Sequence, residues 1–271
     1  MTDLYAVIGN PIAQSKSPRI HAAFARQLRQ DLRYEAILGP LGGFQGAVEG
    51  FCAQGGRGLN VTVPFKLDAF ALATERTERA EQAGAVNTLK FEGAGVVGDN
   101  TDGAGLIADV RGRLDVMLQG TRILLMGAGG AARGVLLPLL REGPVSITIA
   151  NRTVDRATAL ARRFHPFGPV EGGDYARLAG RSFDVVINAT SASLYGEVPP
   201  VPSGIFAPGA LAYDMAYGSG PTAFLGFARD QGAGRLADGL GMLVAQAAES
   251  FFLWRGVRPD IEPVIAMLRA G

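Results

Sequence analysis

The fold of this chain is decided by residues 121–133, which read Thr-Arg-Ile-Leu-Leu-Met-Gly-Ala-Gly-Gly-Ala-Ala-Arg. The apolar first half predicts a buried strand, and the glycines predict a tight turn into a helix. Gly127 permits the turn, Gly129 lets the backbone approach a pyrophosphate, and Ala132 allows close packing of helix on strand. Free N–H groups at the helix start can bind phosphate. Glycine turns are common in a chain with 38 glycines, so the dinucleotide interpretation depends on its context.

The segment after the next strand favours NADP over NAD. Residues 145–150 predict that strand, and the sequence continues Asn151, Arg152, Thr153 and, three residues later, Arg156. In NAD sites an acidic residue stands near this position and accepts the ribose hydroxyls. Arginine can instead bind a 2'-phosphate through its planar guanidinium group. The alternative is that both arginines are solvated residues at the start of a helix.

Outward from this unit, strand and helix patterns alternate along the whole chain. We expect further strands at residues 4–8, 33–38, 58–62, 183–187 and 211–216, a hairpin from 86–91 and 96–98, and helices at 17–28, 44–54, 66–73, 102–115, 240–254 and 260–269. Such alternation is typical of α/β proteins with largely parallel sheets. At roughly 150 residues per domain, 271 residues predict two domains.

Composition argues against several classes of function. The net charge is +1 and the 26 basic residues are scattered, so we expect no nucleic-acid or membrane partner. The first nine residues lack the features of a signal peptide, and no apolar run approaches the ~20 residues of a membrane span. We therefore expect a soluble cytoplasmic protein. His21 and His165 are far apart and Cys52 is the single cysteine, which predicts no metal site.

Lys66 and Asp102 are the candidate catalytic pair. An amine can carry a proton to or from a carbonyl oxygen, and a carboxylate can hold that amine in place. Pro64 fixes its own backbone and restrains Val63, so the chain before Lys66 has a defined direction. The alternatives are a surface lysine that opens a helix and an acid that stabilises a helix N-terminus.

The chain resembles the shikimate dehydrogenase family from end to end. Nine motifs in the same order carry the resemblance, at residues 15–17, 60–66, 85–88, 98–103, 127–133, 151–153, 188–191, 214–218 and 238–242. The resemblance implies an NADPH-dependent oxidoreductase of chorismate and aromatic amino acid biosynthesis, which reduces 3-dehydroshikimate to shikimate. It also implies a discontinuous substrate-binding domain, residues 1–101 plus 239–271, a Rossmann-like NADP-binding domain, 102–238, and an active-site cleft between them.

The family pattern also assigns site residues. Lys66 would protonate the ketone oxygen while NADPH delivers hydride, and Asp102 would orient Lys66 and accept a substrate hydroxyl. The implied substrate contacts are Lys66, Asp102, Ser15, Ser17, Asn60, Thr62, Asn87, Tyr217 and Gln246. The implied cofactor contacts are Gly127, Ala128, Gly129, Gly130, Ala131, Asn151, Arg152, Thr153, Arg156, Thr190, Ser191, Met215 and Gly239. For the serines the alternative is helix capping, and for Met215 it is an ordinary core residue.

Three rival functions remain at this point. An NAD-dependent quinate or dual quinate/shikimate dehydrogenase could use the same site, although Arg152 and Arg156 argue against it. A ligand sensor without turnover would not need Lys66 and Asp102. A folate-linked dehydrogenase of similar architecture finds no support in Ser15 and Ser17. The sequence leaves open whether the enzyme is a monomer or a homodimer.

Overall fold

The protein forms two compact units. Its structure is a computed structural model that describes residues 2–93, 95–218 and 220–270. The first unit comprises Met1–Leu106 and Leu243–Gly271, and the second comprises Ile107–Met242. The two boundaries fall within α5 (Asp102–Ile107) and α9 (Leu240–Arg255), so each of these helices has residues in both units. The boundaries expected from the sequence lie at the first turns of the same two helices.

The first unit is built on a mixed sheet with the strand order β2-β1-β3-β5-β6-β4. β1 is parallel to both of its neighbours, whereas β5 is antiparallel to β3 and β6. The predicted hairpin is therefore present as β5 and β6. Ala94, which the sequence analysis placed between the two strands, lies outside the described residues. The strands are β1 (Asp3–Gly9), β2 (Leu32–Leu38), β3 (Gly56–Val61), β4 (Glu75–Arg76), β5 (Thr88–Glu92) and β6 (Gly95–Asp99).

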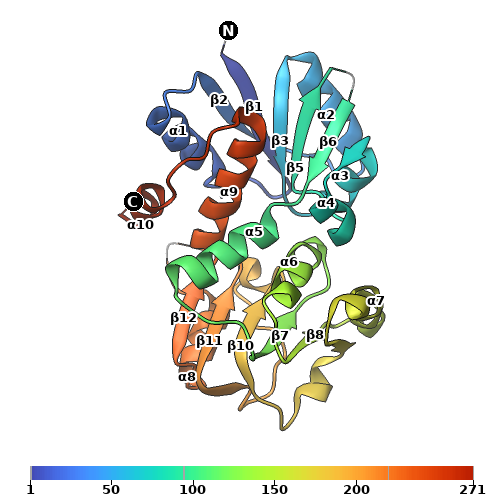
Figure 1. The fold of residues 1–271 in the computed structure, drawn as a ribbon, viewed down its shortest axis with the longest axis vertical. Helices are drawn as coiled ribbons and strands as arrows, with labels where there is room; N and C mark the ends of the chain where they lie inside the picture. Colours follow the sequence, from blue (N-terminus) through green and yellow to red (C-terminus); the bar gives the residue numbers. More distant parts are fainter. Residues whose placement is uncertain (1, 94, 219, 271) are drawn as a thin grey trace. The chain divides into compact units, whose positions relative to one another are not determined.

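Helix α9, the last helix but one among the described residues, contributes its residues from Leu243 onward to the first unit (Figure 1). The indole nitrogen of Trp254 donates a hydrogen bond to the Leu89 carbonyl at 3.0 Å. A side chain at Gly58 would clash with the Trp254 ring, so glycine lets this helix pack on β3. Leu243–Gly271 belong to the same compact unit as Met1–Leu106. The other helices here are α1 (Ser17–Gln27), α2 (Phe44–Ala53), α3 (Lys66–Leu72), α4 (Glu78–Ala83) and α10 (Glu262–Ala270).

The second unit is a parallel doubly wound sheet with the order β12-β11-β10-β7-β8-β9. The order reverses between β7 and β10, the position where such sheets bind ligands at the carboxyl ends of their strands. Its strands are β7 (Arg122–Met126), β8 (Ser146–Ala150), β9 (Val170–Gly173), β10 (Phe183–Asn188), β11 (Phe206–Asp214) and β12 (Arg235–Asp238). Its helices include α6 (Gly130–Arg141), α7 (Val154–Phe164) and α8 (Ala223–Asp230). The sequence analysis did not predict β9 and β12, because both strands are short and lie at the edges of the sheet. It also did not predict α8.

One predicted helix is wrong in its second half. The helix expected at 102–115 is regular only in α5, and Ala108–Arg113 is π-helical. Within that segment Asp109 is 1% exposed and accepts the Tyr213 hydroxyl at 2.6 Å and the Arg113 Nε at 2.5 Å. The distant partner Tyr213 is invisible to a periodicity argument, and wide turns of this kind often mark functional regions.

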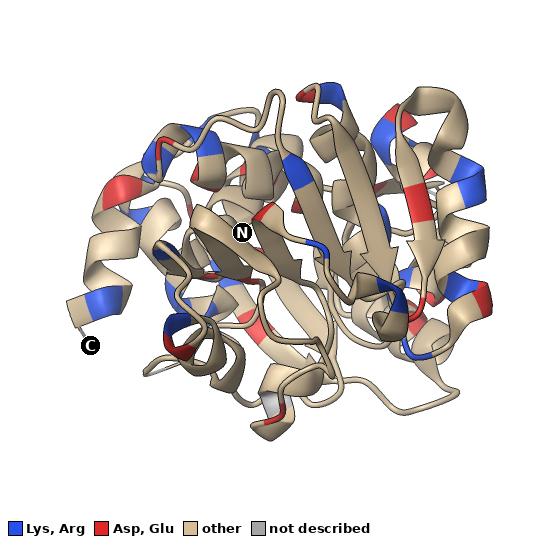
Figure 2. Cartoon of the chain, turned by 90° about the horizontal axis from the view of Figure 1, so that it is seen from below, with Lys and Arg blue, Asp and Glu red and all other residues tan. Residues whose placement is uncertain are grey.

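Charged residues are interspersed over the surface. Figure 2 shows Lys and Arg positions alternating with Asp and Glu positions around the chain. In the parts of the chain that the structure describes, none of the helices has the length and apolar character that a membrane crossing requires.

Candidate active site

The side chains of Lys66 and Asp102 form a direct ion pair. Lys66 is the first residue of α3 and Asp102 the first of α5, and Lys66 Nζ donates to Asp102 Oδ2. Their side chains are only 13% and 6% exposed. Buried Phe65 anchors the chain just before Lys66. Because each charge compensates the other, the pair can be kept away from water.

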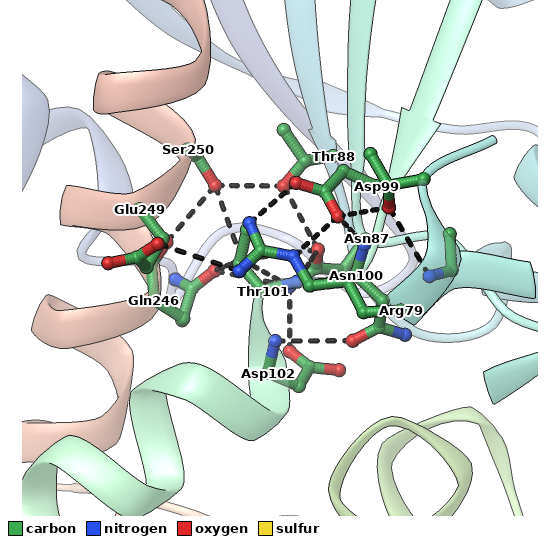
Figure 3. Close-up of polar contacts among 12 residues, drawn as sticks. Arg79, Asn87, Thr88, Asp99, Asn100, Thr101, Asp102, Gln246, Glu249 and Ser250 are labelled. Atoms are coloured by element: carbon green, nitrogen blue, oxygen red, sulfur yellow. Dashed lines mark hydrogen bonds and ion pairs between the residues drawn. The ribbon is translucent and has the colours of Figure 1, made fainter. Parts of the chain in front are cut away.

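Asn87 holds the second carboxylate oxygen of Asp102. Its amide nitrogen lies 2.8 Å from Asp102 Oδ1, 2.9 Å from the Thr101 hydroxyl and 3.3 Å from Gln246 Oε1 (Figure 3). Gln246 reaches this cluster from α9 and also accepts from Thr101 at 3.2 Å. The structure therefore brings four predicted residues, Lys66, Asn87, Asp102 and Gln246, into one network. The carboxylate of Asp102 has a donor on each oxygen.

A second ion pair fixes the loop that carries Asp102. Asp99 is 1% exposed and accepts two hydrogen bonds from Arg79, both at 2.6 Å. It also accepts from the Thr77 hydroxyl at 2.6 Å and the Asn100 backbone at 2.7 Å. The hydrogen bond to Asp99 raises the pKa of the Arg79 guanidinium. The sequence analysis did not identify Arg79, because nothing local distinguishes it from other helix arginines. Asp99 lies within the motif at residues 98–103, but no role was assigned to it.

The predicted substrate residues of the first unit follow neighbouring strands. Ser15 and Ser17 come after β1, and Thr62 comes after β3, which is parallel to β1, so they share one edge of the sheet. Ser15 Oγ accepts the Ser17 N–H at 3.3 Å. Lys16, and not a serine, occupies the N-cap of α1 and makes no side-chain cap, so the capping interpretation of Ser17 is wrong. Asn60 has its amide hydrogen-bonded to protein groups at both ends.

The glycine fingerprint of the second unit adopts the expected strand, turn and helix. Gly127 has φ +107°, and a side chain there would lie 3.0 Å from the Ala189 carbonyl oxygen. Gly129 is the N-cap of α6, has ordinary φ, and a side chain there would meet nothing within 4 Å. Ala132 is fully buried against the sheet. Gly127 is thus needed by the fold, whereas Gly129 leaves open space at a helix N-terminus.

The residues after β8 suit a phosphorylated ribose. Arg152 and Arg156 are exposed, and β8 ends at Ala150 without an acidic residue before Asn151. The Asn151 amide donates to the Thr153 carbonyl at 2.9 Å, which folds the turn into α7. Burial raises the pKa of Tyr175 to about 12, and the nearby charge of Arg152 opposes that shift.

The remaining predicted cofactor residues follow the ends of β7, β10, β11 and β12. Thr190 donates to Asn188 Oδ1 at 2.7 Å, and its methyl group lies 3.3 Å from the position of a Gly127 side chain. Gly239 packs on Met215, whose carbonyl oxygen would clash with any side chain there. Ala128, Gly130 and Ala131 lie between β7 and the first turn of α6, exposed Ser191 follows Thr190, and half-buried Tyr217 lies two residues beyond Met215.

Asp214, the last residue of β11, is the centre of a hydrogen-bond network at the carboxyl end of that strand. The sequence analysis assigned it no role. Its buried carboxylate accepts hydrogen bonds from Ser193 at 2.6 Å, Thr222 at 2.5 Å and the Ala216 backbone at 3.0 Å. Burial raises its pKa, and these hydrogen bonds oppose the shift. The Asp214 network holds the segment that leads to Tyr217. A polar residue at the end of a buried strand was the available signal.

Family models match most of the chain. The model described as the shikimate dehydrogenase substrate binding domain matches residues 7–89, and the shikimate / quinate 5-dehydrogenase model matches 110–195. The model of the shikimate 5'-dehydrogenase C-terminal domain matches 239–269. These segments contain most of the residues described above.

Individual relatives agree with the models. The shikimate dehydrogenase (NADP(+)) of Dechloromonas aromatica is 63% identical over 270 residues, covering 100% of this chain and 98% of the relative. That of Nitrosospira multiformis is also 63% identical with the same coverage. Among solved structures, the Thermus thermophilus shikimate 5-dehydrogenase in complex with NADP(H) and shikimate has 31% identity, a TM-score of 0.86 and 99% coverage of both chains. Full-length identity of this order, on this fold and these motifs, places the chain in the shikimate dehydrogenase family.

Proposed function

We propose that this chain is an NADP-dependent shikimate dehydrogenase, which reversibly reduces 3-dehydroshikimate to shikimate. The observation that carries the proposal is the shielded Lys66–Asp102 ion pair, within a chain that belongs to this family. The names of the relatives support both the substrate and the cofactor.

In the proposed mechanism Lys66 is the proton donor. Its ammonium group gives a proton to the ketone oxygen in reduction and takes it back in oxidation. Asp102 holds the ammonium in place by a charge-assisted hydrogen bond and accepts a substrate hydroxyl. The bound cofactor supplies the hydride. Because the pair is shielded from water, the proton is directed to the bound substrate.

Neutral polar side chains would bind the rest of the substrate. A ring acid with several hydroxyls needs many donors and acceptors, and these residues supply them without additional buried charges. We assign this role to Ser15, Ser17, Thr62, Asn87, Tyr217 and Gln246.

The second unit would hold the cofactor. Open space at Gly129 and the N–H groups at the start of α6 fit a pyrophosphate. Exposed Arg152 and Arg156, without an acid at the end of β8, fit a 2'-phosphate. We assign cofactor contacts to Gly127, Ala128, Gly129, Gly130, Ala131, Asn151, Arg152, Thr153, Arg156, Thr190, Ser191, Met215 and Gly239.

We further propose that residues 1–101 plus 239–271 bind substrate and that 102–238 bind NADP. The Lys66–Asp102 pair is complete within one chain, so a cytoplasmic monomer or homodimer would serve equally well.

The test is an absorbance assay of purified protein with shikimate or quinate, each with NADP and with NAD. We expect the highest kcat/KM with shikimate and NADP. Preference for NAD would overturn the cofactor assignment, and preference for quinate would overturn the substrate. Binding of shikimate in titration calorimetry without turnover would identify the chain as a ligand sensor.

A further inference from the structure

A buried chain of hydrogen bonds in the first unit ends at Asp102. It runs through Asn60, Ser250, Thr88 and Asn87, none of which is more than 5% exposed. Figure 3 shows Ser250 and Thr88 at one end of the polar cluster and Asp102 at the other. Ser250 and Thr88 are not among the residues assigned to substrate or cofactor above.

The donors and acceptors fix the orientation of the Asn87 amide. Asn87 Oδ1 accepts the Thr101 backbone N–H at 2.8 Å, and a backbone N–H can only donate. The amide nitrogen therefore faces Asp102 Oδ1 at 2.8 Å. The Thr88 hydroxyl donates to Asn87 Oδ1 at 2.9 Å and lies 2.8 Å from Ser250 Oγ, a contact in which either hydroxyl can be the donor. Ser250 also donates to the Gln246 carbonyl at 3.1 Å.

Asn60 holds the far end of the chain. Its amide nitrogen donates to Ser250 Oγ at 2.9 Å and lies 3.4 Å from the Asn87 carbonyl, which can only accept. Its Oδ1 accepts the Tyr34 hydroxyl at 2.7 Å. Both ends of the Asn60 amide thus have protein partners, as both ends of the Asn87 amide do.

We propose that Thr88, Ser250 and Asn60 are positioning residues, which act through Asn87 to hold Asp102 where Lys66 requires it. The inference rests on the proposed function. Without the Thr88 hydroxyl the Asn87 oxygen would keep only its donors from Thr101, so the amide would be held less firmly beside the Asp102 carboxylate. Buried networks fix such an orientation only when each member is satisfied, and small displacements of a catalytic group cost turnover.

The test compares Thr88→Val, which keeps the shape and removes the hydroxyl, with Thr88→Ser, which keeps the hydroxyl. We expect Thr88→Val to lower kcat roughly tenfold, a typical effect for coupled buried groups. The KM for shikimate should change less and the KM for NADP not at all, while Thr88→Ser should restore most of kcat. Ser250→Ala should have a smaller effect, and the double variant Thr88→Val/Ser250→Ala should be no worse than Thr88→Val, because Ser250 acts through Thr88.

Wild-type kcat in folded Thr88→Val would overturn the inference, as would equal losses in Thr88→Val and Thr88→Ser, or losses that multiply in the double variant. If Thr88→Val does not fold by circular dichroism, Ser250→Ala decides: reduced kcat with unchanged KM for NADP supports the proposal, and wild-type kcat refutes it. Absence of turnover in the wild-type protein would instead be a failure of the proposed function.

Discussion

Lys66 Nζ contacts Asp102 Oδ2 although the two residues are 36 positions apart in the chain. Lys66 is the first residue of α3 and Asp102 is the first residue of α5. Asp99 accepts the Asn100 N–H and so holds the buried segment that directs Asp102 toward Lys66. An amine and a carboxylate shielded together are suited to proton transfer at a bound carbonyl.

Replacement of Lys66 by Ala should lower kcat far more than it raises KM. A general acid contributes roughly 10²- to 10⁴-fold, and the proton is needed mainly in the transition state. Steady-state kinetics in both directions would measure the loss. Lys90→Ala is the matched control, because Lys90 pairs with Glu92 in the same unit and has no proposed catalytic role. Near-normal turnover in folded Lys66→Ala would exclude Lys66 as the proton donor.

Two fingerprint glycines should respond differently to alanine. Gly127→Ala should reduce the free energy of unfolding by roughly 1–3 kcal/mol, because its φ is +107° and the Ala189 carbonyl is close. Gly129→Ala should keep the fold, because its side chain would enter open space. It should nevertheless weaken NADP binding by roughly tenfold or more, about 1.4 kcal/mol. Urea unfolding and fluorescence titration with NADPH measure the two effects, and tight NADPH binding by Gly129→Ala would contradict the assignment.

Arg152→Ala/Arg156→Ala should lose selectivity for NADP. Charge-assisted hydrogen bonds to a phosphate from exposed groups predict a loss of roughly 10- to 100-fold in kcat/KM for NADP. The value for NAD, which lacks the 2'-phosphate, should change little. Arg162→Ala, another exposed arginine on α7, is the control. An equal loss with both cofactors would show that these arginines do not recognise the phosphate.

His21 should make the fold sensitive to acid. Burial lowers its pKa from 6.5 to about 3, with the nearby Asn60 amide opposing the shift, and its ring stacks on Tyr34 at 4.1 Å. Below pH 6.5 the His21 imidazole binds a proton in the unfolded chain, whereas in the folded protein it stays neutral until the pH approaches about 3. The free energy of unfolding should therefore fall as the pH falls toward about 3, by up to about 1.4 kcal/mol per pH unit.

His21→Phe keeps the aromatic stacking and should flatten that pH dependence. The matched control is His165→Phe, because His165 is exposed and should leave the slope of the wild-type protein unchanged. Thermal unfolding between about pH 4 and pH 6.5, within the window set by the shift of His21, measures the slopes. Identical slopes in wild type and His21→Phe would contradict the prediction.

Local signals in the sequence were sufficient for the fingerprint turn of the second unit and the strand after it. The turn after β7 needs glycine at residue 127 because of its positive φ, and this requirement is written in the chain itself. Arg152 and Arg156 likewise follow a recognisable strand. The π-helical segment was missed, and one contact within it, the hydrogen bond from Tyr213 to Asp109, joins residues 104 positions apart.

The sequence by itself determined the α/β architecture, the fingerprint turn and the candidate pair, because backbone conformation and apolar periodicity are properties of neighbouring residues. Only the tertiary structure decided what surrounds Asp102. Thr88 meets Ser250 across 162 positions and Asn60 meets Ser250 across 190, and no local pattern encodes such contacts. They exist because α9 packs on β3 and β5, where buried polar groups must find partners within the protein.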